Sequence, residues 1–193
     1  MNMNTSKKTK SLLSKRKLAR VDIGCGANKQ GEDWFGIDYR KLDGVDLVQD
    51  LEKFPWAIPS ESFNLALSSH VIEHINPSHG IFISFMNECW RILKPGGEFI
   101  IGAPYATSPG MFRDPTHCNF ITEETWSYFD PFDQINGGHL YPIYAPLPWA
   151  IKMNTWHSTG NIEVVLVKRP IAKEYNIDKE YLKLLKKHTN LTK

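Results

Sequence analysis

The sequence predicts an α/β protein with a doubly wound, mostly parallel sheet of about seven strands and a C-terminal antiparallel strand pair. Three observations support this prediction. Short apolar segments alternate with helical or loop segments through the first half of the chain. Phe63–Ser69 is apolar without alternation, which is typical of a strand buried on both faces. Two strand-like segments near the C-terminus flank a short turn.

The elements of the parallel part follow in order along the chain. Besides Phe63–Ser69, we predict strands at Arg20–Gly24, Trp34–Asp38, Val45–Gln49 and Glu98–Ala103. Pro77–Leu93 carries apolar residues at the spacing of a helix that faces a core. Lys94-Pro95-Gly96-Gly97 should end that helix, because proline cannot continue it and glycine accepts the turn.

After Pro104 the pattern changes to a segment rich in proline, glycine and aromatics, Tyr105–Leu147. It contains one predicted helical piece, Thr122–Phe129, with Thr122 as its N-cap. The antiparallel pair is predicted at Trp149–Trp156 and Ile162–Lys168, with the turn at Ser158–Asn161. At the chain ends we expect disorder over residues 1–10, a short basic helix at Ser11–Lys17 and an amphipathic helix at Asp178–His188.

These elements define a basic N-terminal arm at 1–19, a main domain at 20–170 with an acceptor-side insert at 105–149, and a C-terminal tail at 171–193. Residues 1–20 carry seven lysines and arginines and no acid, although the net charge is only +2. This arm could contact nucleic acid, lipid headgroups or an acidic substrate, and the favoured interpretation is a solvated tail. No apolar run approaches the roughly 20 residues of a membrane span. With no secretory signal and three cysteines that lack metal-type spacing, we expect a cytoplasmic protein.

The first crossover connection is unusually short. Only fourteen positions separate Gly24 from Asp38, and the loop between Gly26 and Trp34 has seven residues. A parallel crossover normally needs at least about 10–12 residues, so its helix should shrink to about one turn. We therefore predict that the N-terminal segment covers the bare patch of sheet. The side chains expected to pack there are Leu12, Leu13 and Leu18.

Three consecutive strands are predicted to end in residues suited to a nucleoside ligand. Gly24 and Gly26 follow the first strand and let the backbone pass close to a ligand. Asp38 ends the second strand, where a carboxylate can accept both ribose hydroxyls, and Asp50 ends the third. Since ligands of open α/β sheets bind at the carboxyl ends of the strands, these groups should line one crevice.

Five motifs, in this order, resemble the type-11 group of class I, Rossmann-like methyltransferases that use S-adenosylmethionine (SAM). The motifs are VDIGCG, GIDYR, VQDLEKFP, FNLALSSHVIEHI and WRILKPGGEFIIGAP. The resemblance covers about residues 20–130. It implies SAM as the cofactor, with the methionine part passing the Gly24–Gly26 loop. The other cofactor contacts that it implies are Asp22, Cys25, Asp38, Tyr39, Asp50, Leu51 and Ser69. A nicotinamide cofactor is disfavoured, because its pyrophosphate needs the helix N-terminus that the short crossover lacks.

A group of histidines follows the fourth strand. His70, Glu73 and His74 would share one helix face, and His117 follows Asp114-Pro115-Thr116. Imidazole and carboxylate suit Zn²⁺, Fe²⁺ or Mn²⁺ better than Mg²⁺. The placement is similar to that in two metal-using groups, the ubiquinone-pathway O-methyltransferases and the small-RNA 2′-O-methyltransferases, except that His70 replaces a glutamate. A metal-free acid/base role and a purely structural role are the alternatives.

The acceptor side offers further candidates. His117 is the first choice for general base and His70 the second, with Asp114 orienting His117. Tyr105 is expected to border the acceptor pocket, and Arg113 to bind an anionic acceptor. We predict methyl transfer to a hydroxyl or amine of a small molecule or saccharide. The alternatives are a metal-assisted RNA 2′-O-methyltransferase and a non-catalytic SAM-binding protein, and the sequence does not indicate the oligomeric state.

Overall fold

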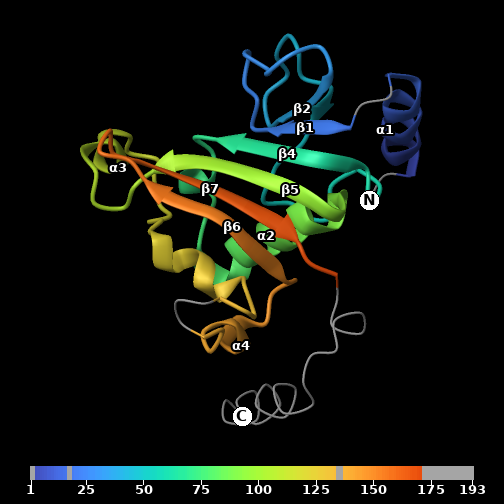
Figure 1. The fold of residues 1–193 in the computed structure, drawn as a ribbon. Helices are drawn as coiled ribbons and strands as arrows, with labels where there is room; N and C mark the ends of the chain where they lie inside the picture. Colours follow the sequence, from blue (N-terminus) through green and yellow to red (C-terminus); the bar gives the residue numbers. More distant parts are fainter. Residues whose placement is uncertain (1–2, 17–18, 134–136, 171–193) are drawn as a thin grey trace.

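A computed structural model describes residues 3–16, 19–133 and 137–170. A seven-stranded sheet with the order β3-β2-β1-β4-β5-β7-β6 runs through it (Figure 1). The strands are β1 (Arg20–Ile23), β2 (Trp34–Asp38), β3 (Leu47–Val48), β4 (Phe63–Ser69), β5 (Leu93–Pro104), β6 (Trp149–Trp156) and β7 (Asn161–Lys168). Neighbours from β3 to β5 are parallel, whereas β7 runs antiparallel to both β5 and β6. The predicted fold class is therefore confirmed.

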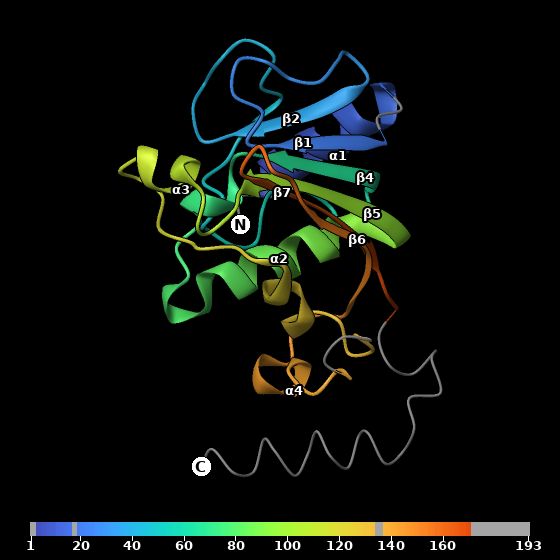
Figure 2. The same cartoon turned by 60° about the vertical axis from the view of Figure 1, so that its left-hand side comes forward.

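Helices and short 3₁₀ turns connect and cover these strands. They are α1 (Met3–Arg16), η1 (Ile72–His74), η2 (Ser78–Gly80), α2 (Ile81–Ile92), α3 (Pro109–Arg113), η3 (Glu123–Tyr128) and α4 (Tyr141–Tyr144). In both views α2 and α4 lie on the same side of strands β5 to β7 (Figures 1 and 2). α2 buries Phe82, Phe85, Met86 and Cys89 against the core, as its apolar spacing predicts. Within the described residues no helix has the length and apolarity that crossing a bilayer requires.

Two predicted boundaries around α2 are wrong, and the backbone explains both. The helix begins at Ile81 rather than Pro77, because His79 and Gly80 adopt positive φ values of 55° and 72°. Lys94–Gly97 does not lie outside the next strand. It forms an irregularity within β5, since Phe63 pairs with Leu93 and Leu65 already pairs with Glu98.

The first crossover contains no helix at all. Residues 24–33, all described, form only turns and bends, so the predicted single helical turn is wrong. Polar contacts hold this loop instead. The backbone N–H of Gln30 donates to Asp22 Oδ2 at 3.1 Å, and Lys29 Nζ pairs with Asp46 Oδ2 at 3.1 Å. The loop is therefore fastened to the sheet without regular secondary structure.

The N-terminal segment forms α1, which lies near the start of β1 (Figure 1). The prediction of disorder for residues 1–10 is wrong for residues 3–10, which are helical. Leu12 and Leu13 pack against the core, as predicted. Leu18 and the predicted helix at 178–188 lie outside the described residues.

Candidate functional site

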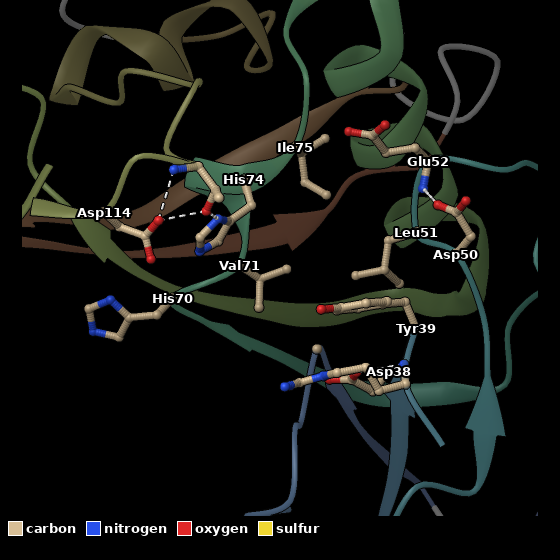
Figure 3. A pocket seen from close by; sticks show the side chains of 13 residues that line it. Asp38, Tyr39, Asp50, Leu51, Glu52, His70, Val71, His74, Ile75 and Asp114 are labelled. Carbon is tan, nitrogen blue, oxygen red and sulfur yellow. Dashed lines mark hydrogen bonds and ion pairs between the residues drawn. The ribbon is translucent and has the colours of Figure 1, made fainter. Parts of the chain in front are cut away.

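A hollow of about 560 Å³ opens at the carboxyl ends of β1 and β2 and beside the segment that follows β4 (Figure 3). Thirteen residues line it: Gly24, Asp38, Tyr39, Arg40, Asp50, Leu51, Glu52, His70, Val71, His74, Ile75, Asp114 and Thr116. Asp38, Tyr39 and Asp50 lie at one end of the view, and His70, His74 and Asp114 lie at the other. The three predicted strand tips thus share one crevice.

Gly24 brings the first loop close to the chain that follows β4. The backbone N–H groups of Gly24 and Cys25 both donate to the Ile37 carbonyl, at 2.8 and 3.0 Å, which folds the loop onto β2. Gly24 has a φ of +74°, and a Cβ there would lie 2.3 Å from Val71 Cγ2. Only glycine satisfies both the left-handed backbone and the contact with Val71.

Asp38 is a buried carboxylate at the end of β2 with hydrogen bonds to both oxygens. Its Oδ2 accepts from the Gly26 N–H at 2.9 Å. Its Oδ1 accepts from the Arg40 N–H at 2.9 Å and from Arg40 Nε at 3.1 Å. Burial alone would raise the pKa of Asp38, but the hydrogen bonds from Arg40 and Gly26 outweigh it and lower the pKa. The side chain is therefore an ionised acceptor that faces the hollow.

Asp50, Leu51 and Tyr39 form the other wall at this end. Asp50 Oδ1 accepts from the Glu52 N–H at 3.0 Å, and Lys53 Nζ lies 3.1 Å from Asp50 Oδ2. The Tyr39 side chain is 69% exposed, and its ring extends over the hollow beside Leu51 (Figure 3). An exposed aromatic face next to an aliphatic side chain can hold a flat ring by stacking.

A second hollow of about 620 Å³ adjoins the first. The two share His70, His74 and Asp114 in their walls. The other residues that line the second hollow are Glu73, Pro104, Pro109, Gly110, Arg113, His117, Thr159, Gly160 and Asn161. His70 and His74 therefore lie on the border between the two hollows, and His117 lies in the wall of the second.

His70, Glu73 and His74 do not share one helix face, contrary to the prediction from their spacing. η1 covers only Ile72–His74, and His70 precedes it with a φ of 55°. Glu73 is fully buried, with its Oε1 3.3 Å from His70 Nδ1 and 4.0 Å from His117 Nε2. The nearby Glu73 carboxylate raises the pKa of His70. The rings of His74 and His117 meet edge to face, with centroids 4.7 Å apart.

The loop that carries His117 is tied to η1 through the backbone. The N–H groups of Cys118 and Asn119 donate to the Glu73 carbonyl at 2.9 and 3.0 Å. The Asn119 side chain donates to the Ile72 carbonyl at 3.0 Å. These bonds bring together residues more than forty positions apart in the sequence.

Each imidazole is oriented by an acceptor at its Nδ1. His117 Nδ1 lies 2.9 Å from the Met111 carbonyl, which can only accept, so Nδ1 carries the hydrogen. His74 Nδ1 lies 2.9 Å from Thr116 Oγ1, whose own hydrogen goes to Asp114 Oδ1 at 2.7 Å. Both neutral rings therefore keep the lone pair on Nε2. The expected role of Asp114 is corrected: through Thr116 it orients His74, whereas Met111 orients His117.

Comparisons with known proteins show what this domain is similar to. Residues 21–101 match the family model described as "Methyltransferase domain". This part of the chain is therefore similar to a methyltransferase domain. The match confirms the resemblance that the sequence motifs carry, to the class I SAM-dependent methyltransferases. No curated protein sequence matches the chain.

Solved structures with the same fold span most of the chain. A SAM-dependent methyltransferase from Archaeoglobus fulgidus is 16% identical, with a TM-score of 0.52 over 84% of this chain and 94% of its own. A 16S rRNA adenine N1-methyltransferase from Catenulisporales acidiphilia is 15% identical, with a TM-score of 0.54 over 84% and 91%. A 1,6-didemethyltoxoflavin N1-methyltransferase from Burkholderia thailandensis is 13% identical, with a TM-score of 0.51 over 87% and 78%. At these identities the likeness is one of fold.

Not every residue predicted for the methyltransferase site lines a hollow. Asp22 is buried beneath the loop, where burial raises its pKa and Gln30 donates to it. Cys25 is buried as well, and its thiol pKa is raised to about 11, mainly by burial, so it stays protonated. The Gly26 N–H donates a hydrogen bond to Asp38. Ser69 is exposed and lines neither hollow.

Of the two residues predicted to contact the acceptor, Arg113 lines the second hollow and Tyr105 does not. The Tyr105 hydroxyl donates to Glu123 Oε2 at 2.7 Å, which turns it away. The sequence analysis did not predict that Thr159–Asn161 line the second hollow, because the sequence of a hairpin turn does not indicate which part of the fold the turn contacts. It also missed Arg40, Glu52, Val71, Ile75 and Thr116. Of these, Val71 and Ile75 lie within the HVIEHI motif, and Glu52 follows Asp50 closely.

Proposed function

We propose that this methyltransferase binds SAM in the first hollow and transfers its methyl group to a hydroxyl or amine held in the second. The observation that carries the proposal is the shared wall of the two hollows, formed by His70, His74 and Asp114. A donor and an acceptor placed on either side would meet beside the histidines. We favour a small molecule or saccharide as the acceptor and a cytoplasmic location.

The first hollow fits SAM on three counts. The ionised Asp38 can accept hydrogen bonds from both ribose hydroxyls, in exchange for its present bonds with the exposed Arg40 side chain. Tyr39 and Leu51 offer apolar surfaces for the adenine ring, and Asp50 lies beside them to accept from its amino group. Because Gly24 has no Cβ, only its backbone would face the ligand. We assign the methionine part to the stretch between Gly24 and the histidines.

When bound, SAM supplies a methyl group already activated by its sulfonium. The chain's own residues then have to align the acceptor with that methyl and keep water away. A neutral hydroxyl or an ammonium also has to lose a proton. His117 Nε2 and His70, both in the wall of the second hollow, are the groups proposed to receive it. His117 suits this role because its Nδ1 hydrogen is donated to the Met111 carbonyl, which leaves the lone pair on Nε2.

RNA is the second candidate acceptor, for which one surface observation speaks. Phe112 and Phe120 are 70% and 56% exposed, and their rings are 6.2 Å apart. Phe112 precedes Arg113 at the end of α3, and Arg113 lines the second hollow. Exposed aromatic rings beside an arginine can stack nucleotide bases and contact phosphate. A SAM-binding protein without catalysis is disfavoured, because it would need no histidines at the border of an acceptor space.

The proposal is tested by SAM binding and by methyl transfer. Calorimetry on the full chain should show SAM binding, and Asp38→Ala should weaken it about 100-fold, since about 3 kcal/mol of charged hydrogen bonding is lost. Asp33→Ala is the matched control. Asp33 is exposed, and its ion pair within the described part of the chain is with Arg20. Labelled SAM offered with pooled metabolites, glycans and RNA should then identify the acceptor. Undiminished SAM binding by Asp38→Ala would refute the assigned site.

A further inference from the structure

We propose that Glu73, His74 and His117 form a binding site for one divalent transition-metal ion on the border of the two hollows. One ligand atom from each residue lies within 4.8 Å of the other two. Ligand atoms about 2.1 Å from a shared ion are roughly 3–4 Å apart. His117 Nε2 and Glu73 Oε1, at 4.0 Å, already meet this spacing. Small rotations of side chains would complete the set.

The charge of Glu73 is an independent reason for a cation. Its side chain is fully buried, and neither carboxylate oxygen accepts a hydrogen bond within the described part of the chain. A buried carboxylate whose oxygens accept no hydrogen bond costs several kcal/mol unless a nearby cation compensates it. His70 approaches only Oε1, and its side chain is 55% exposed. A metal ion between the carboxylate and the two imidazoles would compensate the burial.

The orientation of the imidazoles points the same way. In metal sites, a ligating histidine donates its other ring N–H to a carbonyl or carboxylate, which fixes the tautomer. Here Met111 accepts from His117, and Thr116, backed by Asp114, accepts from His74. Two histidines from separate segments are thus both set to present Nε2. A packing role would require neither arrangement.

The donor set selects the class of ion. Two imidazole nitrogens and one carboxylate suit Zn²⁺, Fe²⁺ or Mn²⁺, whereas Mg²⁺ and Ca²⁺ prefer oxygen ligands alone. Three protein ligands leave at least one position open. All three residues line the second hollow, so that position would be available to an acceptor hydroxyl, whose pKa such an ion lowers. This catalytic role rests on the proposed function, but the binding site does not. His70 is outside the ligand set, unlike in the four-residue set expected from the sequence. With the ion bound, the His117 Nε2 lone pair is occupied, so His70 is then the residue that would receive the acceptor's proton.

The test is metal binding by untagged full-length protein after dialysis against a chelator. Calorimetry with Zn²⁺ and Mn²⁺, and absorption spectra with Co²⁺, should show one ion per chain. Glu73→Gln keeps the shape of the side chain and should weaken binding at least tenfold, as should His74→Ala. His139→Ala is the matched control, an exposed histidine that lines neither hollow.

Three outcomes would overturn the metal site. They are no binding near one equivalent, full affinity in Glu73→Gln, and a loss in His139→Ala equal to that in His74→Ala. Thermal unfolding with and without Zn²⁺ separates ligation from folding, since only the wild type and the control should gain stability from the ion. SAM calorimetry on metal-free protein is read separately. A missing metal site would therefore leave the SAM site standing, and a failed SAM site would not remove the metal site.

Discussion

Replacing Gly24 with alanine should destabilise the protein by about 2–5 kcal/mol. Two costs add up. An L-residue at the φ of +74° costs about 1–2 kcal/mol. The new Cβ would also lie 2.3 Å from Val71 Cγ2 and 3.1 Å from Cγ1. Pushing Val71 aside in a packed region costs about 1–3 kcal/mol.

Two further variants divide this total into its parts. Gly80→Ala has nearly the same backbone, with φ of +72°, but a Cβ there meets nothing within 4 Å. Gly80→Ala should therefore lower the stability only by the backbone strain, about 1–2 kcal/mol. Val71→Ala removes both clashing carbons, so the double variant with Gly24→Ala should be more stable than the sum of the single effects by about 1 kcal/mol or more.

Equilibrium urea unfolding followed by the fluorescence of the six tryptophans gives the required free energies. SAM calorimetry on the same variants reports whether the loop has moved. The reasoning is refuted if Gly24→Ala costs no more than Gly80→Ala. It is equally refuted if the double variant shows no coupling, because the Val71 contact would then carry no energy.

Two other parts of the fold give stability predictions for the same urea assay. Leu12→Ala with Leu13→Ala should cost about 2 kcal/mol, since both half-buried side chains pack against the core. Glu88→Ala should cost about 3 kcal/mol, because the buried Glu88 carboxylate accepts from the Trp56 N–H at 2.6 Å and pairs with Arg91 at 2.6 Å.

Both predictions have matched controls. Ser11→Ala with Ser14→Ala changes two exposed positions of α1 and should leave stability unchanged. If the leucine pair proves equally neutral, α1 does not cover the sheet. Glu98→Ala removes a more exposed ion pair with Lys152 and should cost less than about 1 kcal/mol. Equal losses in Glu98→Ala and Glu88→Ala would contradict the importance of burial at Glu88.

Local patterns were sufficient to predict most of the sheet. β2 and β4 have the predicted bounds, because unbroken apolar runs flanked by polar residues define buried strands. Thr122 caps η3 through a reciprocal capping box with Thr125, which is a short-range interaction. The start of α2 was mispredicted because His79 and Gly80 adopt positive φ values. The helical turn predicted in the first crossover is absent, and a hydrogen bond to the Asp22 side chain holds that loop instead.

The sequence by itself determined the end of the site that we propose binds SAM. Gly24, Asp38 and Asp50 each follow a predicted strand, and parallel strands bring their carboxyl ends to one edge. The end that we propose for the acceptor was decided only by tertiary structure. Met111 and Thr116 orient imidazoles, and Asn119 fastens their loop to η1, through contacts between segments far apart in the chain. A hydrogen bond depends on distances and angles in space, which residue spacing fixes within a strand or helix but not across a loop of irregular backbone.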